Sequence, residues 1–172
     1  ALNGLNDIAY NAMNQEDFPS FGNWIKQGAT VTWEKWNGAD SRNHPMFGGG
    51  LTWFYRILAG VNVDAERPAY EHIIIKPILD KRLPEVYYSH MTPYGEVMSE
   101  IRQTGRNLEM NVTVPVGSTA TIYIPVGGNT SEVTESGISV RDSKDVRFER
   151  IQDGNCIVRV PQGKYKFKVD NQ

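Results

Sequence analysis

Cysteine, long apolar runs and an excess of charge of either sign are all scarce in this sequence of 172 residues. Its one cysteine, Cys156, cannot form an intramolecular disulfide, which excludes the cysteine-rich secreted scaffolds. Because Cys156 begins the alternating run CIVRV, we expect a small buried core residue there rather than a nucleophile. The sequence also lacks the stretch of about 18 apolar residues that a membrane-spanning helix requires.

Acidic and basic side chains nearly cancel, with 20 Asp and Glu against 18 Lys and Arg and a formal net charge of −2. Because no run is rich in Lys or Arg, neither nucleic acid nor an anionic membrane is an expected partner. Hydrophobic residues make up 40% and charged residues 22%, which is ordinary for a folded protein. His72 and His90 lack metal-ligand spacing, and we expect neither a metal nor a cofactor.

Helical periodicity dominates the first 60 residues, which hold all four tryptophans. One expected helix face comprises Leu2, Leu5, Ile8, Ala9 and Ala12. A later face comprises Phe47, Leu51, Phe54 and Leu58, and Gly60 follows at a C-cap position. A short helix is expected between them, over residues 21–25. Two or three helices bury too little surface to fold alone, so we expect them to end a larger helical domain.

After about Asp64 the pattern changes to short alternating segments separated by turn residues. Strands are expected at residues 72–76, 108–114, 120–124 and 165–169, with turns at 104–107, 115–118, 125–129, 152–155 and 161–164. This spacing predicts an antiparallel β-sandwich. We therefore expect an α+β chain, with a helical domain over residues 1–64 and a sandwich over residues 65–172.

The segment richest in residues that could bind a ligand or take part in catalysis, residues 28–38, reads GATVTWEKWNG. If it is extended, Thr32, Glu34 and Trp36 share one face, while Trp33 points to the other. A carboxylate beside an indole suits a sugar, because the ring covers the apolar face of a pyranose. Glycosidases need two carboxyl groups across the scissile bond, and Glu34 could be one of them. The alternative is that Glu34 is solvated or salt-bridged and that the tryptophans are core residues.

The next segment, residues 37–50, reads NGADSRNHPMFGGG and is expected to form a polar loop that leads into a helix. His44 could contact a sugar hydroxyl or exchange a proton near neutral pH, or it could merely cap that helix. Asp40 and Arg42 are expected to form a surface ion pair. Asn111 and Asn129 begin glycosylation sequons, a three-residue pattern that often occurs by chance.

Three ordered blocks, GATVTWEKW at 28–36, NHPMFG at 43–48 and WFYRILAG at 53–60, resemble the C-terminal region of bacterial α-L-rhamnosidases of glycoside hydrolase family 78. The resemblance continues through YEHIIIKP at 70–77 and TPYG at 92–95, and fades after about Pro125. Three blocks in matching order and spacing are much more specific than any single one of them.

The resemblance implies that the helical part is the last portion of an (α/α)₆ barrel and that the β-sandwich domain follows it. Glu34 falls on the general base of an inverting reaction, and His44 falls on a histidine near the bound rhamnose. Trp33 and Trp36 fall on aromatic residues that line the pocket. The family's general acid lies in an upstream acidic motif that this chain does not contain, so the chain alone is expected to be inactive. The short loop between Trp36 and His44 leaves the fine specificity open.

The expected partners are a rhamnose-containing glycoside or polysaccharide and the upstream part of the same enzyme, because the chain begins ALNG without an initiator methionine. A polysaccharide-degrading role slightly favours the periplasm or the exterior over the cytoplasm.

Three alternative functions stay open. A carbohydrate-binding module would hold its aromatic residues on the sandwich, a structural module would bind no sugar, and a related (α/α)₆ glycosidase would act on another sugar.

Overall fold

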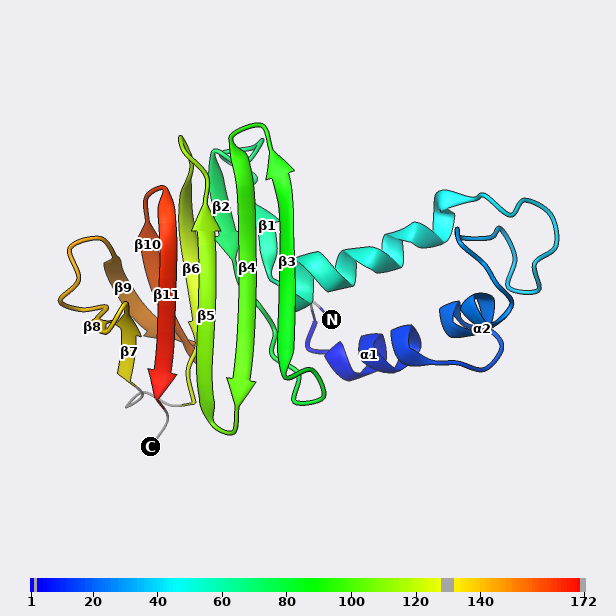
Figure 1. Cartoon of the computed structure of the whole chain (residues 1–172), viewed down its shortest axis with the longest axis horizontal. Coiled ribbons are helices and arrows are strands. Elements are labelled where there is room, and N and C mark those ends of the chain that lie inside the picture. Colours follow the sequence, from blue (N-terminus) through cyan, green and yellow to red (C-terminus); the bar gives the residue numbers. More distant parts are fainter. Residues whose placement is uncertain (2, 128–131, 171–172) are drawn as a thin grey trace. The chain divides into compact units, whose positions relative to one another are not determined.

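The chain divides into two compact units, Ala1–Ile57 and Leu58–Gln172, which are drawn in Figure 1. The computed structural model describes residue 1, residues 3–127 and residues 132–170. Leu2, expected on the first helical face, and the sequon at Asn129 lie outside the described residues. The predicted domain boundary at residues 64 and 65 falls inside the second unit, and it stays a prediction.

The first unit consists of short helices joined by long loops. They are α1 (Asn6–Asn14), α2 (Phe21–Lys26), the 3₁₀ helix η1 (Pro45–Leu51) and the π-helix η2 (Trp53–Leu58). Ser20 caps α2, because its hydroxyl oxygen accepts a hydrogen bond from the Asn23 N–H at 2.9 Å. Gly60 follows η2 with a φ of +75°, the left-handed conformation expected of a residue that ends a helix. All three predicted helical regions are thus confirmed.

The helical faces differ from those predicted. Leu5 and Ile8 are 54% and 63% exposed, so the expected buried face of α1 is open in this chain. In the last helical region Leu58 is buried as predicted, but Leu51 and Phe54 are exposed, whereas Trp53 and Ile57 are buried. A π-helix has hydrogen bonds between residues i and i+5, so it has more residues per turn than the 3.6 assumed from the sequence.

The second unit is a β-sandwich. Its strands are β1 (Val61–Val63), β2 (His72–Ile75), β3 (Glu85–Thr92), β4 (Gly95–Thr104), β5 (Asn107–Val114), β6 (Thr119–Pro125), β7 (Glu132–Glu135), β8 (Ile138–Ser139), β9 (Arg147–Gln152), β10 (Asn155–Val160) and β11 (Gly163–Asp170). One sheet has the order β1-β2-β6-β10-β9 and the other has the order β3-β4-β5-β11-β7-β8. The pairing of β2 with β6 is parallel, and the other pairings between described strands are antiparallel. The predicted sandwich is confirmed, with one parallel pair added.

Alternating side chains from the two sheets form the sandwich core. In β5 all four inward residues are at most 5% exposed, and Phe167 of β11 is fully buried. Removing such a side chain from water stabilises the fold by roughly 1.5–3 kcal/mol. Cys156 is buried in the same core, and this burial raises the pKa of its thiol to about 11. Its expected role as a core residue is confirmed, because so weak an acid supplies little thiolate for chemistry.

His72 is a buried polar residue, 3% exposed, at the parallel junction of β2 and β6. Its Nδ1 lies 2.6 Å from the Thr119 hydroxyl oxygen, and its Nε2 lies 2.8 Å from that of Thr121. Burial lowers the pKa of His72, and the nearby Arg67 acts in the same direction. The pKa of His90 on β3 is lowered by burial as well.

We predict that the sandwich loses stability as the pH falls below about 6.5, the pKa of an unfolded histidine. In this range the unfolded chain binds protons that the folded chain excludes, so acid favours unfolding. The free energy of unfolding in urea should therefore fall between pH 7.5 and pH 5.5, and less so in His72→Gln. The control His44→Gln removes a more exposed histidine, whose side chain is 37% accessible, and should keep the wild-type dependence. An unchanged pH dependence in His72→Gln would contradict this account.

Candidate functional site

Residues 29–44 form an irregular loop in place of the extended segment considered from the sequence. Two stretches of this loop run antiparallel. The Glu34 N–H donates to the Ser41 carbonyl oxygen at 2.8 Å, and the His44 N–H donates to the Thr32 carbonyl oxygen at 2.8 Å. The Thr32 hydroxyl also donates to the His44 carbonyl oxygen at 2.5 Å. The chain reverses between them with a positive φ at Gly38 and Asp40, and this reversal brings Glu34 and His44 together.

An aromatic cluster supports this loop from α2. Trp24, 2% exposed, lies at its centre and donates from its indole N–H to the Trp36 carbonyl oxygen at 2.9 Å. Its ring centroid lies 5.7 Å from that of Trp33 and 4.5 Å from that of Trp36. Both tryptophans therefore contact the same ring, and the extended conformation that would place them on opposite faces is not adopted. Phe47 also packs against Trp36, at 4.5 Å between ring centroids.

The two indoles of the predicted site differ in accessibility. Trp33 is only 4% exposed, and the Arg42 guanidinium lies 4.8 Å from the centroid of its ring. The same guanidinium donates from Nε to the Gly38 carbonyl oxygen at 3.0 Å. Trp36 is half-buried. Of the two rings, Trp36 thus has the larger surface available to a ligand.

Glu34 and His44 face one another across the loop. The Glu34 Oε2 accepts a hydrogen bond from the Ser41 N–H at 3.2 Å and lies 3.8 Å from the His44 Nδ1. Both side chains are 37% accessible, so water can reach the carboxylate. His44 occupies the N-cap position of η1, yet its side chain makes no capping hydrogen bond. The ring is therefore directed to Glu34, and the capping alternative is not supported.

The charged residues around this pair are arranged differently from the prediction. Asp40 forms its ion pair with Lys35, at 2.5 Å, whereas Arg42 stacks on Trp33. The expected pair of Asp40 with Arg42 is thus wrong, because the reversal at Gly38 turns Arg42 back over the indole. The contact with Asp40 holds the pKa of Lys35 above its usual range. Three residues that organise the loop, Trp24, Ser41 and Arg42, were not assigned these roles from the sequence.

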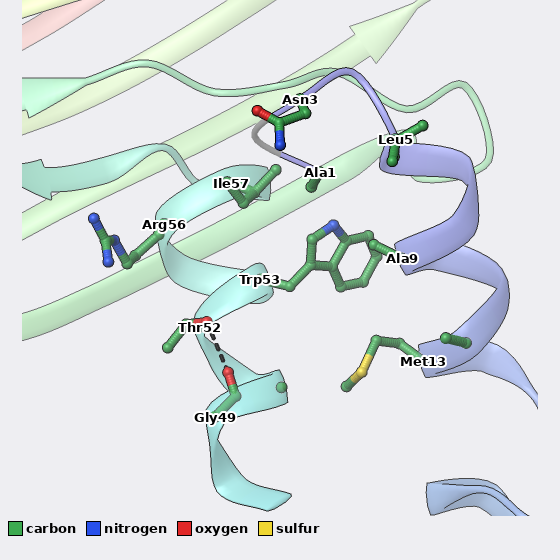
Figure 2. Close-up of a pocket in the computed structure, with 12 residues that line it drawn as sticks. Ala1, Asn3, Leu5, Ala9, Met13, Gly49, Thr52, Trp53, Arg56 and Ile57 are labelled. Carbon is green, nitrogen blue, oxygen red and sulfur yellow. Dashed lines mark hydrogen bonds between the residues drawn. The ribbon is translucent and has the colours of Figure 1, made fainter.

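A separate cleft of about 380 Å³ lies between α1 and η2, as Figure 2 shows. Trp53 projects into it between Ala9 and Met13 of α1, and its indole N–H donates to Asn6 Oδ1 at 2.8 Å. The cleft lining is mainly apolar and includes none of the four predicted site residues. This cleft is therefore distinct from the loop that carries Glu34.

Neither a metal site nor a membrane-spanning helix is found within residues 1, 3–127 and 132–170. In these ranges no three or more His, Cys, Asp or Glu side chains are grouped so that they could hold a metal ion. No helix among the same residues has the length and apolar character needed to cross a membrane.

Comparisons with known proteins match both units. Residues 1–58 match the bacterial alpha-L-rhamnosidase 6 hairpin glycosidase domain, and residues 60–139 match the bacterial alpha-L-rhamnosidase C-terminal domain. The chain is 32% identical over 133 residues to an alpha-L-rhamnosidase of an Alteromonas species, an alignment that covers 71% of this chain and 14% of that protein. It is 25% identical over 177 residues to that of Streptomyces avermitilis, covering 96% of this chain and 16% of the relative.

Solved structures give the same result. The alpha-L-rhamnosidase of Dictyoglumus thermophilum has a TM-score of 0.84 and 32% identity, with 99% of this chain and 19% of that chain covered. The Streptomyces avermitilis alpha-L-rhamnosidase complexed with L-rhamnose has a TM-score of 0.83 and 25% identity, with 97% and 16% covered. The present chain thus spans less than a fifth of the length of these relatives.

The helices followed by a two-sheet sandwich define the end of a helical glycosidase domain together with the β-domain that follows it. The chain belongs to the bacterial α-L-rhamnosidases and corresponds to their C-terminal part.

Proposed function

We propose that this chain is the part of an inverting α-L-rhamnosidase that carries the general base, Glu34. The observation that carries the proposal is the position of the Glu34 carboxylate. It is fixed by the Ser41 N–H, lies 3.8 Å from the His44 Nδ1 and stays 37% accessible to solvent. A base that activates water needs this combination of fixed orientation and access.

In the proposed reaction Glu34 accepts a proton from a water molecule as the water oxygen attacks the anomeric carbon of the rhamnoside. The glycosidic bond breaks on the opposite face of the sugar, and a general acid protonates the leaving oxygen. We place that acid outside this chain, on a carboxyl group roughly 6.5–9.5 Å from Glu34, the separation that leaves room for water in inverting enzymes.

The other three residues would bind the substrate. The half-buried Trp36 offers the larger indole surface to the apolar face of the sugar, and His44 can exchange hydrogen bonds with a hydroxyl group. Trp33 is buried against Trp24 and the Arg42 guanidinium, so it would contribute mainly by holding the substrate-binding loop in place. The proposed ligand is a rhamnose-containing glycoside or polysaccharide.

The exposed apolar residues of the first unit support a partner within the same enzyme. α1 has no buried residue, although helices of folded domains usually bury an apolar stripe. Among the described residues of this unit, the exposed large apolar side chains are Leu5, Ile8, Phe18, Ile25, Val31, Met46, Leu51 and Phe54. We propose that further helices of the glycosidase domain cover them and supply the general acid, so the 172-residue chain alone should be inactive.

The test is turnover of an aryl α-L-rhamnoside by the whole polypeptide that carries these residues, with the 172-residue chain assayed beside it. We expect release of the aryl group by the former and at most a trace by the latter. Turnover by the 172-residue chain would refute the proposed division of acid and base. An inactive whole polypeptide would contradict the proposed rhamnosidase activity and favour a sugar-binding or structural role.

A further inference from the structure

The outer face of the six-stranded sheet carries a groove that the proposed catalytic site does not use. It encloses about 330 Å³, and its lining includes Tyr87, Met98, Asn111, Thr113, Lys164 and Lys166. These residues come from β3, β4, β5 and β11, which lie side by side in the front sheet of Figure 1. Two cross-strand rows form the floor, because Met98 pairs with Thr113 and Asn111 pairs with Lys166. Four strands spaced about 4.8 Å apart give a surface about 14 Å across.

Tyr87 supplies an aromatic surface at one side of this groove. It is 61% exposed, and its hydroxyl donates to the Ser89 Oγ at 3.3 Å. Ser89 lies two residues further along the same face of β3, so the bond directs the ring along the strand. The adjacent Met98 adds a polarizable apolar surface. An exposed ring held in this way can cover the C–H face of a pyranose.

The polar groups of the groove carry both signs of charge. The Asn111 amide donates to Glu100 Oε2 at 2.7 Å, and Lys166 pairs with Glu109 at 2.8 Å. Glu96 lies in the groove lining together with Lys164. This balance disfavours a polyanion such as nucleic acid, whereas mixed donors and acceptors suit a neutral ligand with many hydroxyl groups. Because Asn111 lies inside a strand with its amide engaged, it is also a poor glycosylation acceptor.

We propose that this groove is a second, non-catalytic saccharide site that binds a neutral oligosaccharide, with Tyr87 as its stacking surface. The choice of a rhamnose-containing oligosaccharide rests on the proposed function, whereas the groove itself does not depend on Glu34. Such a site would hold a polymeric substrate close to the enzyme between cleavage events.

The experiment titrates the 172-residue chain, labelled with ¹⁵N, with a neutral rhamnose-containing tetrasaccharide. The amide signals of Tyr87, Met98, Asn111 and Thr113 should shift in a saturable way. Tyr87→Ala should weaken binding about tenfold, which corresponds to about 1.4 kcal/mol and lies within the usual contribution of one aromatic contact. Tyr87→Phe keeps the ring and should still bind. Tyr94→Ala removes a tyrosine that is 40% exposed and lies outside the groove lining, and it should bind as the wild type does.

Two readouts separate this site from the proposed catalytic site. All four tryptophans precede residue 60, so tryptophan fluorescence reports on the first unit and the amide shifts report on the groove. The groove titration should be the same in Glu34→Gln, whatever happens to turnover. The proposal would be overturned if no saturable shift appeared with up to about 10 mM of the tetrasaccharide, because a site with a Kd near 1 mM would then be mostly occupied. Equal binding by Tyr87→Ala would also overturn it, as would shifts that grow with protein concentration alone and mark a self-association surface.

Discussion

Replacing Glu34 by glutamine in the whole polypeptide is expected to lower kcat by about 10²–10⁴-fold, the usual contribution of a general base. The amide has nearly the shape of the carboxylate, and its oxygen can still accept the Ser41 N–H. It cannot take a proton from water, so binding is retained while the chemical step is lost. KM for an aryl α-L-rhamnoside should therefore stay close to the wild-type value.

Asp40→Asn is the matched control for this prediction. Asp40 lies in the same loop and is 52% accessible, but its carboxylate pairs with Lys35 and does not face His44. An exposed ion pair contributes at most about 1 kcal/mol, so this variant should keep most of its turnover. Equal losses of kcat in both variants would indicate that the loop had lost its structure. Near-normal turnover in Glu34→Gln would remove Glu34 from the mechanism.

Gly60→Ala is expected to destabilise the sandwich by about 3–5 kcal/mol, through strain at a positive φ and overpacking against backbone. At the Gly60 φ of +75°, an added Cβ would lie 2.2 Å from the Pro77 nitrogen and 2.3 Å from the Lys76 carbonyl carbon. These atoms belong to the backbone that leaves β2, and the Lys76 N–H donates to the Gly60 carbonyl oxygen at 2.9 Å. Neither of these two backbone segments can move away from the other without breaking the pairing of β1 with β2.

Gly105→Ala separates strain from collision. Gly105 has a φ of +62°, and an added Cβ there would meet no atom within 4 Å. Only the left-handed conformation is penalised, at about 1–2 kcal/mol. Urea unfolding followed by circular dichroism should therefore show a much larger loss for Gly60→Ala than for Gly105→Ala. Equal losses would mean that the close approach of the two backbone segments is not rigid.

The sandwich could be predicted where apolar residues alternate without interruption. This holds for β5, β6 and β11, whose inward positions are buried aliphatic or aromatic side chains. β4 was not predicted, since its inward row includes Ser99, which is fully buried. The Ser99 hydroxyl donates to the Ala59 carbonyl oxygen at 2.8 Å, and a partner 40 residues away leaves no local signal in the sequence.

The helical faces could be predicted only in part, because the period of the last helix is not 3.6 residues. The π-helix brings Trp53 and Ile57 inward in place of Phe54, and the exposed Leu51 lies in the preceding 3₁₀ helix, which has 3.0 residues per turn. The exposed face of α1 has a different origin. Its apolar residues follow the expected spacing but are not buried in this chain, and we propose that further helices of the glycosidase domain cover them.

The site residues could be named from the resemblance but not from periodicity. Glu34 and His44 meet because the chain reverses at Gly38 and at Asp40, and a positive φ at an aspartate has no reliable signal in a single sequence. Trp24 shows the same limit, since its contacts with Trp33 and Trp36 join α2 to a loop with no regular structure.

The most direct test of the role proposed for Glu34 is the anomeric configuration of the first product. Proton NMR during the first minutes of hydrolysis of an aryl α-L-rhamnoside by the whole polypeptide would reveal it. A base that activates water for direct displacement inverts the anomeric carbon, so β-L-rhamnose should appear first and the α anomer only later, by mutarotation. If α-L-rhamnose appears first, the reaction passes through a covalent intermediate and Glu34 does not have the role proposed for it.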